Sequence, residues 1–257
     1  MKFIEVKDLE KGVKEVWLNR PDLHNAFNAE LIEEMISLFE SFEKESSLRL
    51  VILSGRGSSF CAGADLNWMK AMKNYSKEEN FKDSKRLARM FAVINDCPVP
   101  VIGKINGHAL GGGVGLVSVC DYSVAVSSAL MGFTEVRLGL IPAVISPYCL
   151  AKIGEGNGRA WFLSGERFDA EEARRMGLIQ EVSNDLDARI EEIKKRFLAA
   201  GPVAAREAKK LIKGVMKNLK ASEDFTCEMI SERRISAEGQ EGMRALLEKD
   251  KPLWMKV

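Results

Sequence analysis

The chain of 257 residues is long enough for one large domain or two small ones, and 46% hydrophobic residues are enough for a full core. It carries 38 Lys and Arg against 37 Asp and Glu, a net charge of +1. This balance gives no broad attraction to nucleic acid or to an anionic membrane, so neither partner is expected. No apolar run approaches the ~20 residues of a membrane span, and "MKFIEVKDLE" has no signal-peptide core.

The cysteine and histidine content indicates a reduced protein without a metal centre. The five cysteines are odd in number and form no CxxC pair: Cys61, Cys97, Cys120, Cys149 and Cys227. Such usage favours a reduced, intracellular protein, so we expect a cytoplasmic location. With two histidines and no HExxH motif, no metal site is predicted.

Strand and helix signals alternate along the chain to about residue 183. Apolar runs bounded by turn residues predict strands at 3–6, 13–19, 48–55, 99–107 and 121–128. A charged turn at 10–12 joins the first two strands. Asn28 is expected to cap a helix, a turn at 57–70 to enter a second, and 76–96 to form a longer third. The alternation predicts an α/β core.

From Leu186 onward only helical signals remain, at 188–200, 203–219, 222–237 and 241–249. We therefore expect two parts, a core over 1–185 and a C-terminal helical region over 186–257. Basic residues there recur with acids at helical spacing, which predicts a solvated helix face rather than a nucleic-acid patch; examples are Lys194, Lys195, Lys209 and Lys210.

Two glycine-rich turns each follow a strand and open a helix, "SFCAGADL" at 59–66 and "GHALGGGVGL" at 107–116. Neither a GxGxxG nor a GxxxxGK[ST] pattern occurs in the second stretch, which speaks against a phosphate cradle. A tight, closely packed strand-to-helix turn is one reading. The other is that two helix N-termini point unpaired N–H groups at one ligand atom and form an oxyanion hole.

Glu135, in "LMGFTEVRLGLIP", is the candidate acid or base beside such a hole. Its neighbours Met131, Phe133, Val136 and Leu138 predict an apolar setting, which raises a carboxylate's pKa toward the range useful for proton transfer. The alternative is that Glu135 pairs with Arg137 or caps a turn.

Three segments together resemble the enoyl-CoA hydratase/isomerase (crotonase) superfamily: "LNRPDLHNAFN", "SFCAGADL" and "INGHALGGGVGLVSVCDYSVA…FTEVRLGLIP". The resemblance implies a spiral of ββα units with C-terminal helices that build trimers, often paired into hexamers. It also implies that an acyl-CoA thioester oxygen binds the backbone N–H groups of Ala64 and Gly112. Of the family's two catalytic glutamates, the second matches Glu135, whereas the first position holds Gly115.

The same resemblance implies residues for the rest of the substrate. His24 lies in a loop that runs beside the CoA phosphates in the family, and Trp68 faces either the acyl pocket or the core. The implied substrate-binding residues are His24, Ala26, Ala62, Asp65, Leu66, Trp68 and Gly115, the last leaving space beside the acyl group. No cofactor is expected, because coenzyme A is part of the substrate.

Three functions remain open at this point. The leading one is reversible hydration of a 2-enoyl-CoA. "GADLNWMK" and "GLIPAVISPYCL" resemble bacterial methylglutaconyl-CoA hydratases, which suggests a branched or dicarboxylic acyl chain. The second is Δ3,Δ2-enoyl-CoA isomerisation, for which one carboxylate suffices. The third is a non-catalytic CoA- or RNA-binding protein, which the net charge of +1 supports little.

Overall fold

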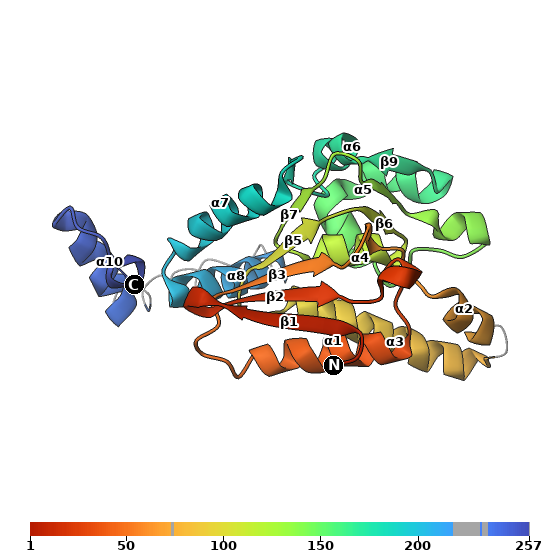
Figure 1. The fold of residues 1–257 in the computed structure, drawn as a ribbon, viewed down its shortest axis with the longest axis horizontal. Coiled ribbons are helices and arrows are strands. Elements are labelled where there is room, and N and C mark those ends of the chain that lie inside the picture. The colour runs from red at the N-terminus through yellow and green to blue at the C-terminus, as the bar shows by residue number, and fades with distance from the viewer. Residues whose placement is uncertain (73–74, 218–231, 233–235, 257) are drawn as a thin grey trace.

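A six-stranded sheet forms the centre of the fold in the computed structural model, which describes residues 1–72, 75–217, 232 and 236–256 (Figure 1). Its order is β1-β2-β3-β5-β7-β10. The strands are β1 (Ile4–Leu9), β2 (Val13–Leu18), β3 (Leu50–Gly55), β5 (Val101–Ile105), β7 (Tyr122–Ala125) and β10 (Glu181–Val182). Only β1 and β2 pair antiparallel, as a hairpin through the turn at Glu10–Gly12; every other pair is parallel.

Helices cover both faces of this sheet, which is why its central strands are largely apolar. All six residues of β3 are buried. On one face α1 (Ala29–Phe42) packs against α3 (Lys77–Asn95), while α7 (Leu186–Leu198) covers part of the other (Figure 1). Asn28 caps α1 through its side chain, and Ser76 caps α3 in a capping box, so both predicted starts are confirmed.

A second sheet of four short strands was not expected from the hydropathy pattern. It has the order β4-β6-β8-β9 and consists of β4 (Ser59–Cys61), β6 (His108–Leu110), β8 (Leu130–Gly132) and β9 (Arg167–Asp169). A three-residue strand has no room for the alternation that marks a strand. Each of the first three follows a strand of the large sheet and is followed by a helix, which gives a repeated ββα unit, as the family resemblance implied.

The helices that follow these units are α2 (Leu66–Met72), α4 (Gly112–Val119) and the 3-10 helix Thr134–Leu138. Two further helices, α5 (Ser146–Ser164) and α6 (Ala170–Arg175), complete the core around the small sheet. The parallel pairs β4–β6 and β6–β8 set the three unit ends side by side. The helix starts therefore converge at one edge of the small sheet.

The C-terminal region contains α7, α8 (Pro202–Lys217), α10 (Ala237–Leu247) and the 3-10 helix Leu253–Met255. In Figure 1, α10 lies at the far left, away from the sheets. Most of the helix expected at 222–237, with Cys227, lies outside the described residues. The other four cysteines are free thiols, all buried.

Lys209 corrects the expectation of a fully solvated helix face on α8. Its ammonium donates to the Asp121 carboxylate at 2.6 Å and to the Val99 carbonyl at 3.3 Å. On the same face Arg206 donates to the Leu48 carbonyl. Lys194 and Lys210 do pair at i,i+3 with acids of their own helices. The spacing thus predicted the surface pairs, but not the basic residues that fix α8 to the sheet.

Candidate functional site

The two glycine-rich turns meet because they follow neighbouring strands. In the β4–β6 pair, Cys61 lies opposite Ala109, so both chains turn at the same edge of the small sheet. Gly63 has a φ of +86°, and a Cβ there would lie 2.8 Å from the Leu110 carbonyl oxygen and 3.5 Å from the Gly112 nitrogen. Only glycine permits this conformation and this approach of two backbones.

Two backbone N–H groups at this junction have no acceptor among the described residues. The Phe27 N–H donates to the Gly63 carbonyl at 2.8 Å, and the Asp65 N–H donates to the Phe27 carbonyl at 3.0 Å. Because donors alternate along an extended chain, the N–H of Ala64 points away from Phe27. Within the described residues, neither Ala64 nor Gly112 donates its N–H to another group. Both are available to a ligand oxygen.

The glycines at the start of α4 allow close packing, and one of them, Gly112, also supplies an unpaired N–H donor. Gly111 is the N-cap with a φ of +53°, and Gly112 begins the helix. A Cβ at Gly112 would lie 2.3 Å from Cζ of Phe27, and one at Gly113 would lie 2.1 Å from the Cys61 carbonyl oxygen. The stretch is therefore a tightly packed turn, and it also leaves the first N–H of the helix without an acceptor in the described chain, as an oxyanion hole requires.

Glu135 lies next to the start of α4. Its 3-10 helix follows β8, the neighbour of β6, and a Cβ at Gly111 would lie 3.4 Å from its Oε1. The other carboxylate oxygen, Oε2, is buried with no hydrogen-bond partner in the described part of the chain. Burial raises the pKa of Glu135 above its usual range. A carboxyl group whose pKa is raised in this way holds a proton more readily than an exposed one, which suits it to general acid–base work.

Two expectations about the surroundings of Glu135 need correction. Arg137 donates its Nε to the Ser164 carbonyl and forms no ion pair with Glu135, so the pairing alternative is wrong. Leu138 is 63% exposed and is not part of the apolar setting, whereas Met131 and Phe133 are fully buried. The desolvation of Glu135 comes from the small sheet and the glycine turns rather than from the end of its own helix.

Gly115 does not leave space beside an acyl group, which contradicts the sequence expectation. It is buried in α4, and a Cβ there would lie 2.3 Å from Cγ2 of Ile145 and 2.9 Å from the ring of Phe91. These apolar side chains fill the direction in which a glutamate side chain would leave the helix. The described site therefore offers Glu135 without a second carboxylate beside Gly115.

The loop expected beside the CoA phosphates is tied to the first glycine turn. The His24 carbonyl accepts the Ala62 N–H at 2.9 Å, and the exposed His24 ring contacts Ser59 Oγ at 3.0 Å through Nδ1. Ala26 is buried, and its carbonyl accepts a hydrogen bond from Arg20. His24, Ala26 and Ala62 thus lie together, with the His24 ring on the surface.

Asp65 supports the turn structurally. It forms an ion pair with Arg20 at 2.7 Å, with both side chains nearly buried, and accepts the Asn67 N–H at 2.7 Å. Burial by itself would raise the pKa of Asp65, but Arg20 and the N–H groups at the start of α2 hold it below the usual range. Asp65 is therefore ionised and fully occupied in fixing Ala64.

Trp68 lies in the core and Leu66 on the surface. Trp68 is 8% exposed and meets Phe27 edge to face, with ring centres 6.4 Å apart; Leu66 is 74% exposed. Trp68 and Asp65 line one end of a pocket of about 340 Å³ beside the start of α1. Of the two readings of Trp68, the structure supports the core. Trp68 packs against Phe27, and Phe27 in turn packs against Gly112.

Sequence reasoning missed the aromatic wall of the site. Phe27, Phe91 and Tyr148 come from three separate segments, with ring centres 6.5 Å apart for the first pair and 6.3 Å for the second. Phe27 and Phe91 contact the glycines of α4, as described above. Each is an ordinary aromatic residue in its own segment, so no local pattern marks it.

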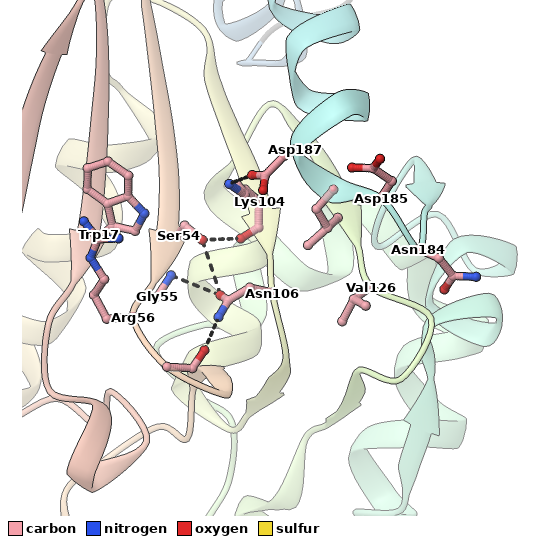
Figure 2. A pocket seen from close by; sticks show the side chains of 12 residues that line it. Trp17, Ser54, Gly55, Arg56, Lys104, Asn106, Val126, Asn184, Asp185 and Asp187 are labelled. Atoms are coloured by element: carbon pink, nitrogen blue, oxygen red, sulfur yellow. Dashed lines mark hydrogen bonds and ion pairs between the residues drawn. The ribbon is translucent and has the colours of Figure 1, made fainter.

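A pocket of about 550 Å³ lies elsewhere, at the carboxyl ends of β2, β3 and β5 on the α7 face of the sheet (Figure 2). None of the sequence-predicted site residues lines it. Lys104 pairs with Asp187 across it, and Asn106 accepts the Gly55 N–H at 3.2 Å. Its polar groups are largely paired with one another.

In the ranges given above, no cluster of three or more His, Cys, Asp or Glu is arranged to hold a metal ion. Among the helices of those ranges, none is long and apolar enough to cross a membrane.

Comparison with known proteins identifies the family of this chain. The family profile "Enoyl-CoA hydratase/isomerase" matches residues 8–256. The short-chain-enoyl-CoA hydratase of Clostridium acetobutylicum is 30% identical over 251 residues, which are 96% of this chain and 95% of that protein. The crystal structure of an enoyl-CoA hydratase from Shewanella pealeana superposes with a TM-score of 0.93 at 36% identity, covering 98% of this chain and 96% of that one. One from Bacillus anthracis gives 0.91 at 30% identity, covering 98% of each chain. The chain therefore belongs to the enoyl-CoA hydratase/isomerase family and is an enzyme with the crotonase fold.

Proposed function

We propose that the enzyme reversibly hydrates a 2-enoyl-CoA. The observation that carries this proposal is a lone, desolvated carboxyl group at Glu135, next to the two unpaired N–H groups of Ala64 and Gly112. The thioester oxygen accepts both N–H groups. As negative charge develops on that oxygen, the two fixed donors stabilise it more than they stabilise the neutral ground state.

The proton transfers then fall to Glu135. As a carboxylate it takes a proton from water while the water oxygen bonds to C3, and the C2–C3 double-bond electrons move into the thioester as an enolate. Glu135, now a neutral acid, then gives that proton to C2, either directly or through a water molecule that takes the proton of Glu135 as it gives its own to C2. One water is added in total and Glu135 returns to its starting state.

A second candidate is Δ3,Δ2-enoyl-CoA isomerisation. It is favoured by one observation: Ile145 and Phe91 fill the space beside Gly115, so no second carboxylate stands beside Glu135 there. A single carboxylate suffices for it, because the proton taken from C2 is the one returned to C4. Removal of the C2 proton gives a dienolate, and the oxyanion hole would stabilise the negative charge on its thioester oxygen.

Product mass separates the two reactions. We would incubate the enzyme with crotonyl-CoA, 3-methylglutaconyl-CoA and a 3-enoyl-CoA, each in ordinary and in ¹⁸O-labelled water. Hydration predicts a gain of one water that carries the label. Isomerisation predicts turnover of the 3-enoyl-CoA at unchanged mass. Turnover of 3-methylglutaconyl-CoA in preference to crotonyl-CoA would identify the branched, dicarboxylic substrate that "GADLNWMK" suggests.

We further propose that the C-terminal helices assemble the chain into a homotrimer or a hexamer. Several apolar side chains of this region are exposed in the single chain: Val203, Ile212, Met216, Met243, Leu247, Leu253 and Met255. Exposed apolar residues concentrated in one region are typical of protein interfaces. Light scattering should give three or six times the chain mass of 28.6 kDa, and a monomer would refute the assembly.

The proposal includes no cofactor beyond the coenzyme A of the substrate, and a cytoplasmic location. Dialysis against a chelator should leave turnover unchanged. Micromolar RNA binding with a steep salt dependence would instead revive the non-catalytic alternative.

A further inference from the structure

Helix α4 ends at a lysine that the reaction scheme does not use. The ammonium of Lys152, from α5, donates to the Cys120 carbonyl at 2.7 Å and lies 3.5 Å from the Val117 carbonyl oxygen. Neutral groups occupy other carbonyls of the same helix, with Ser118 Oγ on Val114 and Cys120 Sγ on Leu116. Lys152 is the charged donor at the end of α4 opposite Gly112.

The surroundings of Lys152 leave its positive charge largely uncancelled. The groups that face it are Cys120, Asp121, Cys149 and Lys209. Asp121 already pairs with Lys209 at 2.6 Å, and burial raises the pKa of each thiol to about 12, so both cysteines are neutral. The cluster of five groups therefore carries a net charge of about +1.

We propose that Lys152 is a positioning residue for the oxyanion hole. It holds the C-terminal turn of α4 and neutralises the negative end of the helix dipole. Its charge also adds positive potential at the opposite end, where the Gly112 N–H meets the thioester oxygen. This role goes beyond the family's catalytic glutamate and backbone donors, and it rests on the proposed binding of the thioester at Ala64 and Gly112.

The size of the effect follows from the length of the helix. The eight residues of α4 span about 12 Å at ~1.5 Å per residue. A unit charge at about that distance, with an effective dielectric constant of about 20, changes the stability of an oxyanion about tenfold. We therefore expect kcat to fall about tenfold when the charge of Lys152 is removed, with KM changing less than about twofold.

The experiment measures the oxyanion site directly with acetoacetyl-CoA, whose enolate absorbs in the near ultraviolet. The midpoint pH of enolate formation is measured for the ligand bound to wild type, Lys152→Met, Lys152→Gln and Lys152→Arg. The matched control is Lys213→Met, which removes a lysine paired with Asp96 at the surface. Thermal unfolding of each variant reports stability separately.

The expected result is a midpoint about one pH unit higher in Lys152→Met and Lys152→Gln, with Lys152→Arg and the control near wild type. Lower thermal stability with an unchanged midpoint and kcat would overturn the proposal, because Lys152 would then only stabilise the fold. If the wild type does not bind acetoacetyl-CoA, the proposed function itself fails, and the inference fails with it.

The wild type offers a check that needs no variant to fold. Burial lowers the pKa of Lys152, although Cys120, Asp121 and Cys149 oppose this effect. Loss of its proton should therefore reduce kcat at a pH below the ~10.4 of an ordinary lysine. A wild-type kcat that shows no fall on the alkaline side of its pH profile would also overturn the proposal.

Discussion

Replacing Glu135 by Gln should lower turnover and raise stability at the same time. The side chain keeps its shape but loses its negative charge. In the wild type that charge is shared by Oε2, which is buried without a hydrogen-bond partner in the described chain. Loss of a general acid–base group typically costs 10²- to 10⁴-fold in turnover, so we expect a fall in kcat of that order. Acyl-CoA affinity should change little, because Ala64 and Gly112 still donate to the thioester oxygen.

The stability gain has a defined pH dependence. Because burial raises the pKa of Glu135 in the folded state, the carboxyl group is protonated more readily there than in the unfolded chain. The wild type therefore loses stability as pH rises from the unfolded pKa, near 4.3, through the folded pKa. The variant has no such loss. Removal of one buried, desolvated charge of this kind stabilises a chain by about 1 kcal/mol, which corresponds to a rise in Tm of about 2–4 °C for a chain of this size.

The assay compares thermal unfolding of wild type, Glu135→Gln and a control, Glu166→Gln, at pH 4 and at pH 8. Glu166 is an exposed glutamate outside the site. The variant should gain Tm at pH 8 and little at pH 4, while the control gains at neither. A variant with near-wild-type turnover would remove Glu135 from the mechanism, and equal Tm values at pH 8 would refute its desolvation.

Substitutions at two glycines test the rest of the site. Gly112→Ala would place a Cβ 2.3 Å from Phe27, so it should destabilise the chain by about 1–3 kcal/mol in chemical denaturation. Gly112→Pro, which deletes the donor N–H, should abolish turnover; a folded proline variant of normal activity would disprove the oxyanion assignment. Gly115→Glu should not create a two-carboxylate site by itself, because Ile145 occupies the space, and should be less stable than the double variant Gly115→Glu/Ile145→Ala. If the single variant is as stable as wild type and hydrates crotonyl-CoA faster, the packing argument is wrong.

The sequence predicts elements whose signals are local. The helix caps at Asn28 and Ser76 could be predicted because each depends only on a side-chain oxygen and a free backbone N–H three residues later. The strand at 50–55 is recognisable because burial on both faces makes its first four residues a continuous apolar run that ends at Ser54 and Gly55. Glu135 could be singled out because it is the carboxylate of an apolar segment at a family position.

The remainder depends on contacts between distant segments. The three-residue strand Leu130–Gly132 has no pattern of its own, and only pairing with 108–110 makes it a strand. Gly115 could not be interpreted without Ile145, which lies 30 positions later and fills its side-chain space. Lys152 and Lys209 resemble surface lysines in the sequence, and only the packing of α5 and α8 against the end of α4 gives them partners.

The contact between Gly115 and Ile145 restricts how one catalytic arrangement could evolve into the other. A glutamate at 115 with Ile145 unchanged is crowded out of its space. A small residue at 145 with Gly115 unchanged leaves a cavity, and removing most of an isoleucine side chain from a core typically costs about 2–5 kcal/mol. Either first step is thus disfavoured although the pair of changes is compatible. A change between the one-carboxylate and two-carboxylate forms therefore requires two coupled substitutions, each of which is unfavourable alone. A lineage in either form thus tends to keep that form.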